Sequence, residues 1–128
     1  MPGPFHYQIL NPAYGQEPAP VCELHVSWGT QSRPIRALID SGAGETHLPV
    51  DLIRTLALRK LDDVDVSGAV GNDQAEGLYA ANLDLGGIVM PHFPIISNSK
   101  RDYAIIGRDF IKRYVTNLDG PNQEFTIT

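Results

Sequence analysis

The chain has 128 residues and a mass of 14.0 kDa, which leaves room for one domain with a single core and excludes a two-lobed enzyme whose large cleft lies inside one chain. Lys and Arg total 10 against 15 for Asp and Glu, and the net charge of −5 argues against a nucleic-acid partner held through its phosphates. A single cysteine, Cys22, excludes an internal disulfide and multi-cysteine metal sites, and it favours a reducing, cytoplasmic setting.

The amino-terminal residues 1–20 carry five prolines and are predicted to form an extended arm ahead of a single domain over residues 21–128. The arm has neither the basic start nor the apolar run of a secretory signal. No apolar run of about 18 residues occurs anywhere, so we expect no membrane partner. The 12 glycines and 10 prolines of the chain favour short strands joined by turns.

The first half of the domain predicts a hairpin and a short helix. Residues 21–28 alternate apolar and polar side chains, and a second apolar run at 35–39 follows after a connection of turn residues, as in a β-hairpin. Beyond Pro49, apolar residues at helical spacing over 50–58 predict one or two turns of helix.

The second half of the domain predicts further strands around a glycine-rich segment. Strands are expected at 64–66 and 78–85, and residues 68–77 between them tolerate positive φ, which predicts a mobile hairpin. Residues 88–96 predict a strand in which two prolines indicate an edge or a bulge. The remaining expected elements are a short strand at 104–106, a helix over 108–114 and a closing segment at 124–128. The fold class is therefore mainly β with one or two short helices.

The residue with the clearest chemistry follows the apolar strand that ends at Ile39. Asp40 comes directly after that strand and precedes the small residues Ser41-Gly42-Ala43-Gly44. Such a turn holds a carboxylate at a strand end and leaves little side-chain bulk in front of it. Taken alone, the pattern fits a surface aspartate in an ordinary turn equally well.

A second motif near the end of the domain changes this balance. Ile105-Ile106-Gly107-Arg108-Asp109-Phe110 is an apolar strand that meets a glycine and a helix. Together with Ala37-Leu38-Ile39-Asp40-Ser41-Gly42-Ala43 and Thr46, it resembles the signature of the retropepsin-like aspartic proteases, the family of the retroviral proteases. The resemblance extends over residues 21–128 in layout and is specific in the two motifs only.

The resemblance implies a retropepsin-like acid-protease half-barrel that acts as a symmetric homodimer. Aspartic protease chemistry needs two carboxylates about 3 Å apart that share one proton, and this chain has one such loop. A twofold axis between two copies of Asp40 would supply both carboxylates. The implied function is an aspartic endopeptidase that hydrolyses an extended polypeptide, with one Asp40 as general base on water and the other polarising the scissile carbonyl. This chemistry calls for no cofactor and no metal.

The same resemblance assigns roles around Asp40. Ser41 is expected to hydrogen-bond across the dimer axis, Gly42 to bring backbone close to the carboxylates, and Ala43 to leave room for substrate. Thr46 completes the catalytic-loop support. The residues expected to contact substrate are Leu38, Gly44, His47, Tyr103 and Ile105, together with Val70, Gly71 and Asn72 in a flap formed by the 68–77 hairpin; Ile106, Gly107 and Arg108 are expected to lie beneath the site. A plain core position explains Leu38 and Ile105 equally well.

Two positions depart from the family pattern. The family often has an aspartate where this chain has Gly44, and that aspartate pairs with the arginine that Arg108 matches; Glu45 is a candidate substitute. His47 stands at a usually apolar pocket position, which indicates a different side-chain preference or a histidine turned elsewhere. The rival hypothesis is therefore a catalytically weak or inactive retropepsin-like module for dimerisation or peptide binding.

Other sites are excluded by their spacing. A Ser41–His47–Asp51 triad lacks the Gly-x-Ser-x-Gly turn of a nucleophile elbow. The four histidines show no metal-ligand spacing, and the 68–77 segment lacks the Lys-Ser/Thr of a phosphate loop.

Overall fold

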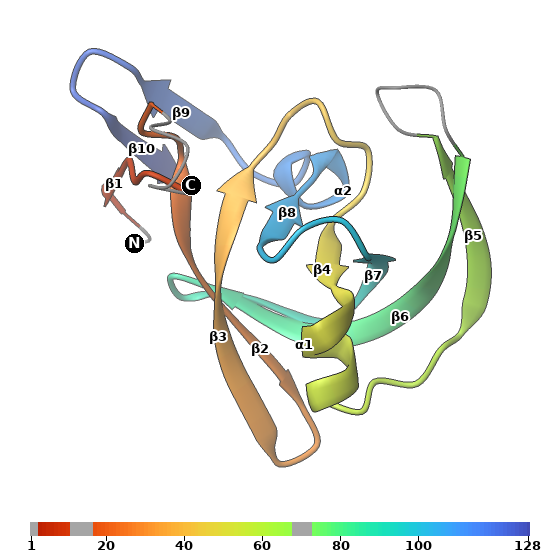
Figure 1. Ribbon diagram of the computed structural model, residues 1–128. Coiled ribbons are helices and arrows are strands. Elements are labelled where there is room, and N and C mark those ends of the chain that lie inside the picture. Colours follow the sequence, from red (N-terminus) through yellow and green to blue (C-terminus); the bar gives the residue numbers. More distant parts are fainter. Residues whose placement is uncertain (1–2, 11–16, 68–72) are drawn as a thin grey trace.

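The architecture consists of a large curved sheet with a small terminal sheet at one end (Figure 1). It was obtained as a computed structural model, which describes residues 3–10, 17–67 and 73–128. The large sheet has the strand order β2-β3-β8-β4-β7-β6-β5 and the small one the order β1-β10-β9. In chain order the elements are β1 (Phe5–His6), β2 (Val21–Trp28), β3 (Gln31–Ile39), β4 (His47–Pro49), α1 (Val50–Thr55), β5 (Asp62–Ser67), β6 (Asp73–Leu85), β7 (Ile88–Asn98), β8 (Ala104–Ile106), α2 (Arg108–Ile111), β9 (Thr116–Asp119) and β10 (Glu124–Ile127).

The large sheet closes on itself through β2. This strand pairs with β3 on one side and with β6 on the other, where Leu24 lies opposite Leu85. Its alternation is the one expected from sequence: Cys22, Leu24 and Val26 are buried, whereas the polar residues between them are exposed. The enclosed side chains form one core, to which the largest fully buried contributors are Phe110, Phe125, Leu24, Leu48, Leu56, Leu83, Leu85, Ile95, Ile106 and Ile127.

A parallel pairing in the middle of the sheet brings the two sequence motifs together. Strand β3 runs parallel to β8, with Ala37 opposite Ala104 and Ile39 opposite Ile106. Parallel strands end at the same edge of a sheet, so the loop after β3 and the helix after β8 begin side by side. Strand β4 follows that loop, pairing antiparallel with β8 at Ile105 and parallel with β7 at Ile96.

The hairpin of β5 and β6 ends the strand order of the large sheet and curves upward at the right of Figure 1. Residues 88–95 of β7 pair with β6 alone, and the exposed Pro91 and Pro94 lie on that edge. The pairing shifts register between Ala81 and Leu83. The edge and bulge expected from the two prolines are thus both present in this pair of strands.

The two helices are short, and the second is shorter than the sequence prediction of 108–114. After Ile111 the chain tightens, since Arg113 and Tyr114 donate to carbonyls three residues back, and Val115 then exchanges two backbone hydrogen bonds with Thr128. The helix therefore ends early because Val115 is hydrogen-bonded to Thr128 at the start of the β9–β10 hairpin. Among the described residues, no helix is long and apolar enough to cross a membrane.

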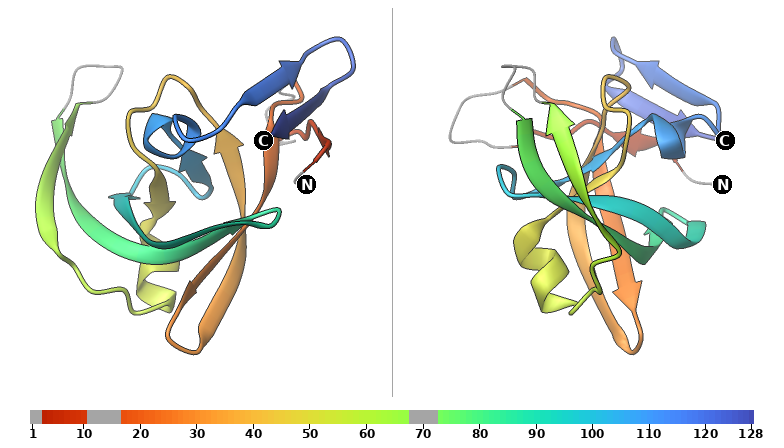
Figure 2. Two further views of the ribbon diagram at one scale, coloured as in Figure 1. Left: turned by 180° about the vertical axis from the view of Figure 1, so that it is seen from behind. Right: turned by 90° about the vertical axis from the view of Figure 1, so that its right-hand side faces the viewer.

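Part of the proline-rich segment joins the fold. Strand β1 pairs with β10, Phe5 stacks on Phe125 with ring centroids 5.0 Å apart, and Gln8 bridges to Ala19. These contacts bring the amino and carboxyl ends close together (Figure 2). The small sheet combines β1, from residues 1–20, with β9 and β10, from residues 21–128. The division of the chain at residue 20 stays a prediction.

The buried Cys22 thiol provides a test of this core. Burial raises the pKa of Cys22 to about 12, so the thiol stays protonated and poorly nucleophilic in the folded chain. We expect no reaction with Ellman's reagent at about pH 8 until denaturant unfolds the protein, and one thiol per chain thereafter. Rapid modification of the native protein would contradict this packing of β2.

Candidate active site

The loop after β3 holds Asp40 through its backbone. The Asp40 amide donates to the carbonyl of Ile106 at 3.0 Å, which continues the β3–β8 pairing by one residue. The Asp40 carbonyl accepts from Ala43 N at 3.2 Å, and its carboxylate oxygen Oδ1 accepts from Gly42 N at 2.9 Å. A Cβ at position 42 would lie 3.1 Å from that oxygen, which explains the glycine. Asp40 is thus half-exposed, its carboxylate is oriented by a backbone amide, and the residues that follow it, Ser41-Gly42-Ala43-Gly44, are small.

A buried polar cluster beneath the loop joins β4 to α2. Thr46 is 0 % exposed; its hydroxyl donates to Asp109 Oδ1 at 2.7 Å and accepts from Gly107 N at 3.2 Å. Asp109 also accepts from the amides of Thr46 and Phe110, at 3.1 and 2.8 Å. Gly107 is required here, because a Cβ would lie 2.4 Å from the Glu45 carbonyl. This cluster fixes the loop from below.

Sequence reasoning missed the role of Asp109, which it named only as a member of the second motif. The carboxylate instead organises Thr46 across a sequence separation of 63 residues. A usable signal was present, since a threonine after the Asp40 turn and an aspartate after Gly107 are complementary hydrogen-bonding residues on motifs already expected to meet.

Arg108 binds the other side of the loop. Its Nη1 donates to the Ser41 carbonyl at 2.8 Å, and its backbone amide donates to the Ala43 carbonyl at 2.8 Å. A Cβ at Gly44 would lie 3.6 Å from Nη2, so the guanidinium extends past the position where the family often has an aspartate. Within the described ranges no ion pair joins Arg108 to Glu45. Glu45 therefore does not replace the missing aspartate as the partner of Arg108. The guanidinium binds the Ser41 backbone carbonyl instead.

A row of side chains crosses the sheet on the face opposite the core. Strand register places Leu38 beside Ile105, Ile105 beside His47, and His47 beside Ile96. Side chains at paired positions share a face, and their chain neighbours Ala37, Leu48 and Ile106 point into the core. Leu38, His47 and Ile105 are half-buried, whereas Ile96 at the end of the row is 5 % exposed and therefore buried; none of the four belongs to the core cluster. We call Leu38, Ile105, His47 and Ile96 the substrate face; its role in binding is a prediction.

Of the other residues predicted to contact substrate, the structure describes Tyr103 and Gly44. Tyr103 is half-buried and directly precedes β8, and Gly44 lies in the loop beside Arg108. Val70, Gly71 and Asn72 lie outside the described residues.

His47 is the polar member of the substrate face. Its ring is half-buried, and within the described part of the chain its buried Nδ1 has no hydrogen-bond partner. Burial lowers the pKa of His47, and the nearby carboxylates of Glu45, Glu76, Asp109 and Asp40 oppose that shift. Desolvation is the larger effect, so the ring is neutral at neutral pH.

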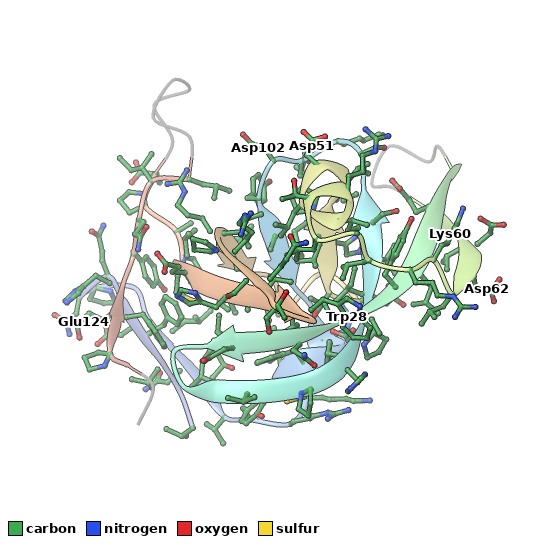
Figure 3. The ribbon with its side chains drawn as sticks, turned by 90° about the horizontal axis from the view of Figure 1, so that it is seen from below. Trp28, Asp51, Lys60, Asp62, Asp102 and Glu124 are labelled. Carbon is green, nitrogen blue, oxygen red and sulfur yellow. The ribbon has the colours of Figure 1, made fainter. Side chains whose placement is uncertain are left out.

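One open pocket lies elsewhere. It has a volume of about 300 Å³ and is lined by none of the predicted site residues; Asp51 and Asp102, which are among its lining residues, are labelled in Figure 3. Over residues 3–10, 17–67 and 73–128, no group of three His, Cys, Asp or Glu side chains is arranged to hold a metal ion.

Comparison with known proteins gives one family. A family model described as gag-polyprotein putative aspartyl protease matches residues 27–113. DNA damage-inducible protein 1 of the fungus Phaeosphaeria nodorum is 27% identical over 117 residues, which cover 86% of this chain and 26% of that protein. The chain thus spans about a quarter of the length of this relative.

Solved structures show the same fold at low identity. The EIAV protease complexed with the inhibitor HBY-793 has a TM-score of 0.62 at 18% identity, over 74% of this chain and 86% of that chain. The solution structure of the simian foamy virus (mac) protease has a TM-score of 0.53 at 18% identity, over 72% of this chain and 91% of that chain. The predicted mainly β half-barrel of the retroviral-protease type is confirmed.

The Thr46 hydroxyl should be essential to the buried cluster. In Thr46→Val the shape is kept, but Gly107 N loses its acceptor and Asp109 loses a donor, so we expect a loss of about 2 kcal/mol in the free energy of unfolding. Thr46→Ser keeps the hydroxyl and should cost about 1 kcal/mol or less. Urea denaturation measures both, and equal losses would show that the hydrogen bonds are unimportant.

His47 should make folding sensitive to acid. Because its pKa is lowered in the folded state, the unfolded chain takes up the proton first as the pH falls, so stability declines below the ordinary histidine pKa and the decline levels off below the folded one. We expect His47→Gln to lose less stability than the parent between about pH 7 and pH 5. Urea midpoints measure this, with the exposed His25→Gln as the matched control. A parallel decline in parent and His47→Gln would show that the ring is not buried in its neutral form.

Proposed function

Because the chain belongs to the gag-polyprotein aspartyl protease family, of retropepsin-like fold, we propose that it is an aspartic endopeptidase that works as a symmetric homodimer. Its substrate would be an extended polypeptide, and two Asp40 carboxylates, one from each copy, would activate the hydrolytic water. The observation that carries the proposal is the Asp40 carboxylate itself, half-exposed and held by Gly42 N at the end of a strand paired to the second motif.

The homodimer follows from the chemistry. Two carboxylates about 3 Å apart share one proton because both cannot be ionised at that separation. Each chain contributes one such loop, so the site is complete only when a second copy faces it across a twofold axis. The exposed Ser41 beside Asp40 is suited to a contact between the two loops, and Arg108 fixes the Ser41 carbonyl.

In the proposed reaction the ionised Asp40 takes a proton from water, and the water oxygen attacks the scissile carbonyl carbon. The protonated Asp40 of the partner copy hydrogen-bonds to the carbonyl oxygen and stabilises the charge that develops there. The proton then passes to the leaving amine, and the peptide C–N bond breaks. The substrate face would hold the side chains that flank this bond, while Ala43 leaves space for the peptide backbone.

The rival function is a dimerisation or peptide-binding module with weak or no hydrolysis. Arg108 favours this alternative to some degree, since it binds a backbone carbonyl where the family often has an arginine–aspartate pair. A cytoplasmic location is proposed on the single cysteine alone, and the activity of any longer protein that contains this chain is likewise a proposal.

Replacing Asp40 should separate the two functions. We expect Asp40→Asn to lower cleavage of a peptide library by at least about a thousandfold, because the amide can neither accept the water proton nor share one with its twin. Dimerisation, measured by analytical ultracentrifugation, should survive. Asp51→Asn, which removes an exposed carboxylate on α1, is the matched control and should cleave like the parent.

Undiminished cleavage by Asp40→Asn would eliminate Asp40 as the catalytic acid. A parent chain that forms dimers and binds peptides without cleaving them would establish the rival function instead.

A further inference from the structure

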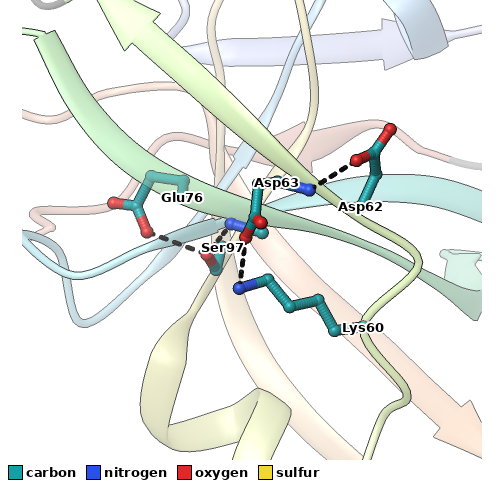
Figure 4. Close-up of polar contacts among 6 residues, drawn as sticks. Lys60, Asp62, Asp63, Glu76 and Ser97 are labelled. Atoms are coloured by element: carbon teal, nitrogen blue, oxygen red, sulfur yellow. Dashed lines mark hydrogen bonds and ion pairs between the residues drawn. The ribbon is translucent and has the colours of Figure 1, made fainter.

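Glu76 is a carboxylate that binds the end of a neighbouring strand; it lies within the expected 68–77 flap, where sequence analysis assigned it no role of its own. Its Oε1 accepts from the Ser97 hydroxyl at 2.8 Å, and its Oε2 accepts from the amide and the hydroxyl of Ser99, both at 3.2 Å (Figure 4). The Ser97 hydroxyl accepts in turn from Gly77 N at 2.9 Å. Strand β6 is thereby bound to the end of β7, and the carboxylate is held in one orientation.

The register places Glu76 on the substrate face. Leu78 lies opposite Ile96, and Ile96 lies opposite His47. Glu76 is two residues before Leu78 on the same strand, so its side chain leaves β6 on the same side. Glu76 is also close enough to His47 to act on its pKa, and it is half-buried, so solutes can reach it.

The negative charge of Glu76 is not neutralised by a neighbour. All three of its hydrogen-bond donors are neutral, and within the described part of the chain no ion pair includes it. The charged groups that act on His47, beside Glu76, are the carboxylates of Glu45, Asp109 and Asp40. A carboxylate offers about four acceptor positions, of which three are occupied. One acceptor position therefore remains for a ligand.

His47 adds to this preference. The neutral ring does not repel a cation, and it replaces the aliphatic side chain that would favour an apolar group at this point of the face. A lysine or arginine side chain can lie along the half-buried Leu38 and Ile105 with its apolar stem and reach the carboxylate with its charged end.

We propose that Glu76 is a specificity-determining residue that makes the subsite beside His47 select a positively charged side chain of the polypeptide, lysine or arginine. The proposal rests on the proposed function, since it assigns the substrate class of the same site. A purely structural Glu76 would need only its hydrogen bonds to β7 and would leave the choice of substrate side chain unaffected.

The test measures binding, so that it does not depend on cleavage. The affinity of the Asp40→Asn variant for extended peptides is measured by fluorescence anisotropy. Each peptide carries a single lysine, placed at successive positions in the series, and is compared with a counterpart in which norleucine replaces that lysine. We expect lysine to bind about tenfold more tightly than norleucine at the position that meets Glu76, and the preference to weaken with added salt. The same comparison in Asp40→Asn with Glu76→Gln should lose most of the preference. Glu23→Gln removes an exposed carboxylate on β2 and is the matched control, which should retain it.

The outcomes separate the two proposals. If the parent cleaves peptides through Asp40 but lysine and norleucine bind equally at every position, the subsite proposal is overturned while the protease function stands. If nothing is cleaved yet lysine is preferred and Glu76→Gln removes the preference, the subsite stands and the protease function fails. Should Glu76→Gln fail to fold, Glu76→Asp keeps the charge, and a lysine preference that is insensitive to salt in that variant would also overturn the proposal.

Discussion

The parallel pairing of β3 with β8 is the constraint on which the site depends. It brings Ile39 beside Ile106 and continues through the hydrogen bond from Asp40 N to the Ile106 carbonyl. Because both strands end at the same edge, the Asp40 turn and the residues after Gly107 begin together, and every later contact of the loop follows from this placement. A shift of one residue in this register would turn Asp40 to the opposite face of the sheet.

Around this pairing the fold builds a prepared half-site. Neutral donors and backbone groups hold the carboxylates in place: Gly42 N orients Asp40, the Thr46 hydroxyl and two amides bind Asp109, and the two serines bind Glu76. The Arg108 guanidinium, which contacts the loop, donates to the Ser41 carbonyl and leaves these carboxylates without a cationic partner from this side chain. Fixing anions with neutral dipoles keeps their charge available, which suits both an acid–base site and recognition of a cationic ligand.

The proposed homodimer would also explain how so short a chain could carry hydrolytic chemistry. A single core of this size cannot enclose a cleft with two catalytic loops, whereas symmetric pairing doubles one loop at no cost in sequence. The similarity to the EIAV and simian foamy virus proteases, at 18% identity, shows that the fold persists when most side chains differ. We therefore expect what distinguishes this chain to lie in individual residues: His47 is the polar member of the substrate face, and Glu76 belongs to the subsite proposed beside it.

The sequence by itself determined the mainly β class, the alternation of β2, the burial of Cys22 and the position of Asp40 at a strand end, because each depends on residues a few positions apart. The tertiary structure alone decided the closure of the sheet by β2 and β6, the pairing of β1 with β10, and the partners of Arg108 and Glu76. These contacts join residues far apart in the chain, and a hydrogen-bonding side chain does not reveal in sequence which of many possible partners the fold will place within 3 Å of it.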